Sequence, residues 1–331
     1  MTTLPGRLVL LGVALAALTL LPPATVAAAP EFDLQAHRGG RGETTEESLR
    51  AFATSLELGV STLELDVVIT KDGQPLVWHD PAIDAGKCTD TAPVVTGDPQ
   101  YPYVGKLVHE LTLEQIRTLD CGRRLAEFPD ATVVRGNKIA TLPEVFALTD
   151  SYRAPTQTGV RYDIETKVEA ANPGASAGPQ QFVDVILAAV RAAGKVDNVE
   201  IESFDWRTLP MVHRAEPDIP LVALYDDTTW APGSPWLAGI DPAVVGDPVL
   251  GALLAGANIV APEYRLVTGR QYVDHAHALG LKVIPWTVND ADTMREQIGD
   301  GVDGIITDYP TKLRGVLADL GMPLPPAYRR V

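Results

Sequence analysis

Hydrophobic residues alternate along the chain between short β-rich runs and longer stretches with helical spacing. The run VIPWTV at 283–288 is apolar on both faces, which is typical of parallel strands covered by helices. The pattern predicts strands at 32–37, 62–70, 75–79, 160–165, 199–204, 221–224, 258–261, 282–287 and 304–307, and helices at 46–58, 113–119, 142–150 and 180–193. About eight strand–helix units favour a closed α/β architecture, the TIM (β/α)8 barrel, over an open sheet.

The first 29 residues do not follow this alternation. They contain Arg7, an apolar run from Leu8 to Leu21 and a small-residue stretch at 27–29, in the order of a secretory signal peptide. The apolar run is shorter than the ~20 residues that a transmembrane helix needs. We therefore predict cleavage after Ala29, residues 30–331 as a single domain, and a secreted, extracellular protein without stable membrane insertion. An uncleaved signal anchor is the alternative.

A loop-rich stretch at 81–137 interrupts the barrel pattern after the second predicted strand, and we interpret it as an insertion. It contains both cysteines of the chain, Cys88 and Cys121. An exported protein meets an oxidising environment, so a disulfide between them is expected to tie the insertion down. Two separate buried thiols are the alternative.

The charge balance excludes one class of partner. Acidic residues outnumber basic ones by 43 to 27, and the net charge is −16. Such a surface repels polyanions, and the sequence has no basic cluster interleaved with aromatic residues, so we exclude nucleic acid. A substrate that carries a phosphate group would need local cations to offset this field.

Carboxylates occur at positions where a barrel places its chemistry. Glu64 and Asp66 are two apart on a predicted strand and therefore point to the same side, while Glu165 ends the next main strand. Buried carboxylates side by side repel each other and lose hydration, and a divalent cation removes that penalty. An all-oxygen set with open positions suits Ca²⁺ or Mg²⁺ rather than Zn²⁺. The alternative is a solvated strand face, which the surrounding Leu, Val and Ile disfavour.

Two histidines also stand at strand ends, His37 after the first strand and His79 after the short third one. One imidazole can remove a proton from an attacking oxygen while the other, as imidazolium, protonates a leaving alkoxide. Arg38 and Lys167, also at strand ends, would hold the charge of a phosphoryl group. With a cation, this set predicts cleavage of a phosphodiester.

The chain resembles the glycerophosphodiester phosphodiesterase family over nearly all of residues 30–331. The resemblance rests on HRGGRGETTEESLRAF, GVSTLELDVVITKDGQPLVWHD and YDIETK, followed by IESFDW, LVALYD, IPWTVND and GVDGIITDYP. It implies a catalytic TIM barrel that hydrolyses glycerophosphodiesters, such as glycerophosphocholine or glycerophosphoethanolamine, to glycerol 3-phosphate and an alcohol. It implies the same roles for the residues discussed above, namely acid/base histidines, phosphate-binding Arg38 and Lys167, and carboxylate ligands for the metal.

The resemblance adds details that the residues alone do not give. It implies that Trp286 faces the substrate, that Glu46 supports the site, and that the 81–137 insertion helps to bind glycerol. Where the family commonly has Pro-Glu-Asn-Thr, this chain has Thr45-Glu46-Glu47-Ser48. Glu47 therefore adds a charge near the site, with consequences for the choice of metal or substrate.

Two other functions fit parts of the same pattern. A related phospholipase, of the lysophospholipase D or phospholipase C type, would need an apolar entrance, for which Trp230, Trp236, Leu237, Val244 and Val245 are candidates. A metal-dependent binding module without catalysis would leave His37 and His79 without a role. The sequence does not decide the ion, the head group, the oligomeric state or whether a cyclic phosphate forms.

Overall fold

A ring of parallel strands forms the centre of the fold. In the computed structural model, which describes residues 1–2, 31–154 and 159–331, eight parallel strands follow the order β10-β1-β2-β5-β6-β7-β8-β9. The Asp303 amide donates to the Val283 carbonyl at 2.9 Å and the Ile306 amide to the Pro285 carbonyl at 3.0 Å. These bonds join the two ends of the series, so the predicted TIM barrel is confirmed.

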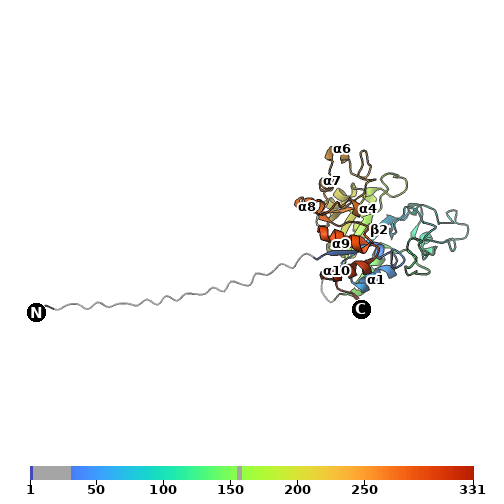
Figure 1. Ribbon diagram of the computed structural model, residues 1–331. Helices are drawn as coiled ribbons and strands as arrows, with labels where there is room; N and C mark the ends of the chain where they lie inside the picture. Colours follow the sequence, from blue (N-terminus) through green and yellow to red (C-terminus); the bar gives the residue numbers. More distant parts are fainter. Residues whose placement is uncertain (3–30, 155–158) are drawn as a thin grey trace. The chain divides into compact units, whose positions relative to one another are not determined.

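The elements alternate along the chain as a barrel requires (Figure 1). The strands are β1 (Asp33–Ala36), β2 (Thr62–Ile69), β3 (Pro75–Val77), β4 (Tyr152–Arg153), β5 (Arg161–Thr166), β6 (Val199–Ser203), β7 (Leu221–Tyr225), β8 (Ile259–Pro262), β9 (Lys282–Val283), β10 (Gly304–Thr307) and β11 (Arg329–Arg330). The α-helices are α1 (Leu49–Leu58), α2 (Leu113–Thr118), α3 (Leu142–Asp150), α4 (Pro179–Ala192), α5 (Thr208–Ala215), α6 (Pro242–Val245), α7 (Pro248–Leu254), α8 (Arg270–Ala278), α9 (Ala291–Asp300) and α10 (Pro310–Asp319). Short 3-10 helices are η1 (His37–Gly39), η2 (Val108–Glu110), η3 (Val196–Asn198) and η4 (Tyr264–Leu266).

Several predicted boundaries differ from the structure for local reasons. Helix α1 begins at Leu49 rather than at 46, because the Ser48 hydroxyl accepts the Ala51 amide and caps the helix there. The predicted strand at 282–287 is regular only over Lys282–Val283. Pro285 has no amide hydrogen to donate to a neighbouring strand, which accounts for the early end of β9.

The predicted strand at 75–79 is not part of the barrel ring. Strand β3 ends at Val77 and pairs antiparallel with β2, with Val77 opposite Val67. It therefore forms a hairpin on β2, and the insertion follows this hairpin. Strands β4 and β11 form a separate antiparallel pair that the hydrophobic pattern did not predict.

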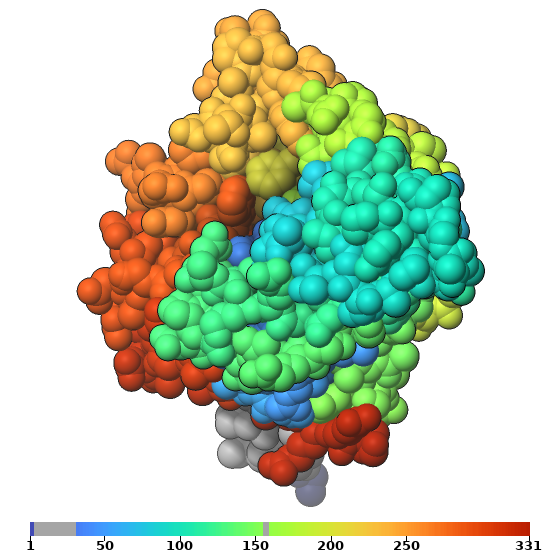
Figure 2. Space-filling model, turned by 90° about the vertical axis from the view of Figure 1, so that its right-hand side faces the viewer, coloured from blue at the N-terminus to red at the C-terminus, as the bar shows by residue number. Residues whose placement is uncertain are grey.

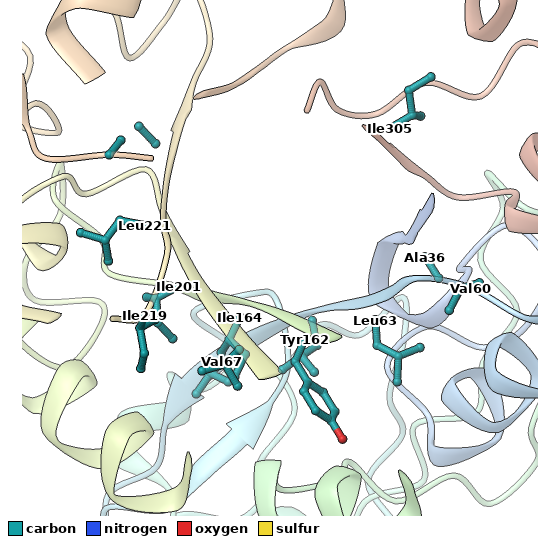
Figure 3. Close-up of a cluster of buried hydrophobic side chains, with 14 of the residues drawn as sticks. Ala36, Val60, Leu63, Val67, Tyr162, Ile164, Ile201, Ile219, Leu221 and Ile305 are labelled. Carbon is teal, nitrogen blue, oxygen red and sulfur yellow. The ribbon is translucent and has the colours of Figure 1, made fainter. Parts of the chain in front are cut away.

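Alternation along the strands separates chemistry from packing. On β2, Leu63, Leu65 and Val67 belong to the main apolar core, between the strands and the surrounding helices. Figure 3 shows Leu63 and Val67 together with apolar residues of neighbouring strands in this cluster. Because successive strand residues face opposite sides, Glu64 and Asp66 point into the barrel.

The insertion has a small apolar core of its own. Cys88 and Cys121 form the predicted disulfide. Around it pack buried residues that include Tyr103, Leu111 and Ile116. In Figure 1 the insertion, coloured cyan to green, lies beside β2. The cross-link and this core fix a segment that contains little regular structure.

The N-terminal prediction lies largely outside the described part of the chain. Residues 3–29 of the predicted signal peptide are not among the described residues, whereas Phe32–Val331 form one unit. In the ranges that the structure describes, no helix is long and apolar enough to cross a membrane.

The turn after β1 requires glycine. Arg38, Gly39 and Gly40 have φ angles of 49°, 75° and 88°, all in the left-handed region. A Cβ atom on Gly39 would lie 3.0 Å from both Ala51 Cβ and a ring carbon of Phe52. The close approach at Gly39 is therefore to helix α1, rather than to a bound group.

We expect Gly39→Ala to lower the free energy of unfolding more than Gly73→Ala, by about 1–3 kcal/mol. Gly73 is a matched control because its φ is also 75° but a Cβ there would meet no atom within 4 Å. Both variants incur the left-handed strain, and only Gly39→Ala adds the clash with α1. Chemical denaturation of the two variants measures the difference, and equal losses would show that the close approach to α1 does not matter.

Candidate active site

Acidic side chains line one side of the barrel interior, on neighbouring strands. In the register of the sheet, Asp66 of β2 lies opposite Glu165 of β5, and Glu165 lies opposite Glu202 of β6. Glu64 stands two residues before Asp66 on the same face. All four carboxylates are nearly inaccessible to solvent. The structure therefore brings the predicted metal ligands Glu64, Asp66 and Glu165 together, with Glu202 as an acidic neighbour.

Two buried cations contact this acidic row. Arg38 Nε lies 2.9 Å from Asp66, and the Arg38 backbone amide donates to Glu64 at 2.6 Å. Lys167 Nζ lies 2.8 Å from Glu165 and 3.6 Å from Asp66. The left-handed turn after β1 aims both the amide and the guanidinium of Arg38 at β2. Both predicted phosphate-binding residues therefore stand beside the predicted metal ligands.

These contacts set the ionisation of the carboxylates. Burial raises the pKa of Glu64 well above its ordinary value, and the charge on Asp66 adds to the effect. Burial also raises the pKa of Glu165, to about 8, although Lys167 opposes it. For Asp66, burial acts to raise the pKa, but Lys167 and Arg38 outweigh it and hold the pKa well below its ordinary value.

Each predicted catalytic histidine is held by an aspartate. His37 Nδ1 lies 2.5 Å from Asp308, and His79 Nδ1 lies 2.7 Å from Asp80. An aspartate on Nδ1 favours the tautomer with its proton on that nitrogen, which leaves Nε2 free to exchange protons with a substrate. Asp308 in turn accepts a hydrogen bond from the Asn289 amide at 2.7 Å.

Burial favours the neutral form of both histidines. Burial lowers the pKa of His37, with Asp308 opposing that effect. Burial and the nearby charge on Lys167 lower the pKa of His79 to about 4. Each neutral imidazole can act as a base, and a bound phosphate anion would favour the imidazolium form that an acid needs.

The insertion contributes a lysine to this arrangement. Lys87, next to the disulfide-bonded Cys88, lies 2.6 Å from Glu46 and 2.6 Å from Asp80. Glu46 also contacts Arg41 Nε at 2.9 Å and Arg38 Nη1 at 3.6 Å. Glu46 is thus surrounded by cations and contacts the site through Arg38.

Glu47, where the family commonly has asparagine, is buried and adopts a left-handed φ of 53°. Its Oε1 accepts the backbone amide of Asp66 at 3.0 Å. Burial and the charge on Asp66 raise its pKa well above the ordinary value. Glu47 therefore braces the strand that carries the carboxylates, through the backbone of Asp66.

The site opens into a cavity of about 210 Å³ with two different walls. The polar wall includes His37, His79 and Lys167, and the apolar wall consists of Phe204, Leu224, Trp286 and Ile306. Trp286, for which the resemblance predicts a role in substrate binding, is part of the apolar wall. In Figure 2 the molecule is hollowed between the insertion, in cyan and green, and the C-terminal part of the chain, in orange.

The residues considered for an apolar entrance do not form one. Leu237 is fully buried, and Trp230 packs against Trp206 and Tyr225 in the core. Val244 is 82% exposed on α6, and Trp236 touches the cavity wall only through Phe204. The candidate residues are therefore dispersed, which weakens the phospholipase alternative.

The carboxylates fit a divalent cation by their chemistry, although the side chains contact Arg38 and Lys167 in this structure. Among the residues described, no three His, Cys, Asp or Glu side chains stand in a metal-binding arrangement. The donor set of Glu64, Asp66 and Glu165 is all oxygen, which Ca²⁺ and Mg²⁺ prefer. Crowded carboxylates whose pKa values are raised by burial are also groups that a dication would stabilise. The ligand role of these residues remains a prediction.

Sequence reasoning assigned no role to several groups at the site. Asp308 directly follows β10, as His37 directly follows β1. A search for polar residues at the ends of predicted strands would therefore have found it. Phe204 ends the predicted strand at 199–204 and carries the same strand-end signal, whereas Lys87 carries none, because its place depends on the fold of the insertion.

Fold and site together define the protein as a TIM-barrel hydrolase, in which two histidines and two carboxylate-bound cations line one cavity. Residues 37–312 match the model of the glycerophosphoryl diester phosphodiesterase family. The chain belongs to this family, and it is an enzyme of the glycerophosphodiester phosphodiesterase class. Enzymes of the family generally use a divalent metal ion.

Individual relatives support the assignment. A glycerophosphodiester phosphodiesterase of Caldanaerobacter subterraneus is 29% identical over 84% of this chain and 94% of its own length. A solved structure of a homologue from Silicibacter pomeroyi is 29% identical, with a TM-score of 0.74 over 88% of this chain and 95% of the other. The structure of an Oleispira antarctica phosphodiesterase with its product sn-glycerol-3-phosphate is 19% identical, with a TM-score of 0.63 over 86% and 96% of the two chains, and shares the fold.

We expect Asp308→Asn to lower kcat by ~10²-fold or more, because an amide at this position no longer favours the productive tautomer of His37. Asp247→Asn is a matched control, since Asp247 contacts His275 Nε2 at 2.6 Å on the outside of the barrel. Steady-state hydrolysis and thermal unfolding of both variants separate catalysis from stability. Equal kcat values for the two variants would show that Asp308 does not orient His37.

Proposed function

We propose that this enzyme hydrolyses glycerophosphodiesters that lack acyl chains, such as glycerophosphocholine or glycerophosphoethanolamine, with two histidines and one divalent cation. The products are glycerol 3-phosphate and the free alcohol. The observation that carries the proposal is the pairing of His37 with Asp308 and of His79 with Asp80 at one cavity that also exposes Lys167. This geometry provides two proton-transfer groups beside a phosphate-binding cation.

The histidines have complementary roles in the proposed reaction. One Nε2 takes a proton from the nucleophilic oxygen as that oxygen forms a bond to phosphorus. The bond from phosphorus to the alcohol oxygen breaks, and the other imidazole, protonated in the complex, donates a proton to this alkoxide. The nucleophile is water or the neighbouring hydroxyl of the glycerol, and the second route gives a cyclic phosphate that water then opens.

The other polar groups bind and orient the phosphodiester. Arg38 and Lys167 are held by carboxylates and therefore present fixed positive charge to the phosphoryl oxygens. Glu64, Asp66 and Glu165 would hold the divalent cation, which when bound neutralises charge on the nonbridging oxygens. Calcium and magnesium are the ions that this oxygen set suits best.

The size of the cavity is evidence for a small substrate. A volume of about 210 Å³ is small for a ligand pocket, which favours a compact substrate over one with a long acyl chain. Phe204 and Trp286 lie on the apolar wall, with their ring centroids 5.4 Å apart. They offer an aromatic surface to the part of the substrate away from the carboxylates. Both features favour the deacylated diester over a lysophospholipid.

We expect chelation to abolish hydrolysis of glycerophosphocholine and added Ca²⁺ or Mg²⁺ to restore it, because the buried carboxylates need a dication to bind an anionic substrate. Release of choline, measured with each ion added back separately, tests this dependence. The acylated counterpart, lysophosphatidylcholine, is the comparison substrate and should turn over more slowly.

Three results would contradict separate parts of the proposal. Hydrolysis that persists in chelator would rule out the cation while leaving the histidine pair in place. Faster turnover of lysophosphatidylcholine would identify a lysophospholipase D. Binding of the diester with no turnover by the native chain would favour the noncatalytic module.

We further propose that the enzyme is exported, on the grounds of the signal-like order of residues 1–29 and the disulfide at Cys88. When the full chain is expressed in a secreting bacterial host, we expect the protein outside the cells to begin near residue 30. N-terminal sequencing measures this directly. Recovery of the full-length chain inside the cells or in the membrane fraction would contradict export by cleavage.

A further inference from the structure

Glu202 is a buried carboxylate that the proposed reaction does not use. It is 2% exposed, and its Oε2 atom has no hydrogen-bond partner. It lies on β6 opposite Glu165, at the end of the row that begins with Asp66. A buried carboxylate oxygen without a partner is costly, so its presence calls for a compensating positive group.

Glu202 is one of the residues that line the active-site cavity, together with Glu64 and Glu165. Strand alternation places its side chain on the same inner face as Glu165, one strand further from the contacts of Lys167. Among the contacts in the described ranges, no cation forms an ion pair with Glu202. Glu202 is therefore a buried carboxylate at the cavity, with one oxygen that has no hydrogen-bond partner.

We propose that Glu202 supplies a fourth carboxylate to the cation site and that this extra ligand makes the site favour Ca²⁺ over Mg²⁺. The inference rests on the cation site of the proposed function. Ca²⁺ accepts six to eight oxygen ligands in flexible geometry, whereas Mg²⁺ keeps several waters and takes one or two carboxylates. A row of acidic residues across three adjacent strands suits the larger ion, because it offers more oxygens than the octahedral shell of Mg²⁺ uses.

Glu200 provides a matched control on the same strand. It stands two residues before Glu202, faces the same side and is also buried. Its Oε1 accepts the Gln35 amide at 2.9 Å, and it does not line the cavity. Replacing either glutamate by glutamine removes one buried negative charge at nearly constant volume, so only the position differs.

The test is calorimetric titration of Ca²⁺ and of Mg²⁺ into the metal-free full chain and its Glu202→Gln and Glu200→Gln variants. We expect Glu202→Gln to raise the Kd for Ca²⁺ by ~10-fold or more and the Kd for Mg²⁺ by less. Glu200→Gln should leave both within about twofold of the native chain, and the shift in thermal unfolding midpoint on adding Ca²⁺ should shrink only in Glu202→Gln. This second readout also reports whether each variant is folded.

The outcomes separate this inference from the proposed function. Native Ca²⁺ affinity in Glu202→Gln, with binding intact in the native chain, overturns the role of Glu202 and leaves the cation site standing. An equal loss of Ca²⁺ and Mg²⁺ affinity in Glu202→Gln overturns the proposed selectivity. Equal losses in Glu202→Gln and Glu200→Gln overturn the ligand role, because they show that only the total negative charge matters. Absence of cation binding by the native chain overturns this inference together with the metal dependence.

Discussion

Balance of buried charge is the constraint on which the rest of the structure depends. Asp66 begins a row of buried acidic side chains inside the barrel, and Arg38 and Lys167 form ion pairs with it. Carboxylates removed from water are stable only when positive charge or hydrogen bonds replace their hydration. The tight turn at Arg38 and the strand end at Lys167 therefore direct the chain and also place positive charge beside the buried carboxylates. The same groups that neutralise the carboxylates present positive charge to a phosphate.

The barrel interior is divided into two halves with different chemistry. Strands β1, β2, β5 and β6 direct acidic and polar side chains inward. Strands β7 to β10 direct an apolar cluster inward, which consists of Val222, Leu224, Ile259, Ala261, Ile284 and Ile306. Because the cavity lies where the halves meet, one wall can bind a charged phosphodiester while Phe204 and Trp286 cover the other. This division gives a substrate a defined orientation without a large cavity.

The two candidate catalytic histidines depend on other parts of the chain for their orientation. His37 follows β1, the first strand of the barrel, yet its partner Asp308 follows β10, the last strand of the barrel. His79 is held by its neighbour Asp80, which Lys87 of the insertion contacts in turn. Closure of the barrel and the disulfide of the insertion are thus coupled to the geometry of the site. A change in the closure of the barrel or in the disulfide would alter the orientation of His37 or His79.

The sequence by itself determined the barrel, the disulfide pair and the juxtaposition of Glu64, Asp66 and Glu165, because strand periodicity and strand-end placement are local rules. Only the tertiary structure decided that β3 is a hairpin outside the ring, since a short apolar run does not reveal its partner. It also decided that Asp308 orients His37, that Lys87 reaches Glu46, and that Glu202 ends with an unpaired oxygen. These outcomes depend on which strand ends and loops meet in space, and contacts between residues far apart in sequence leave no periodic signal in the chain.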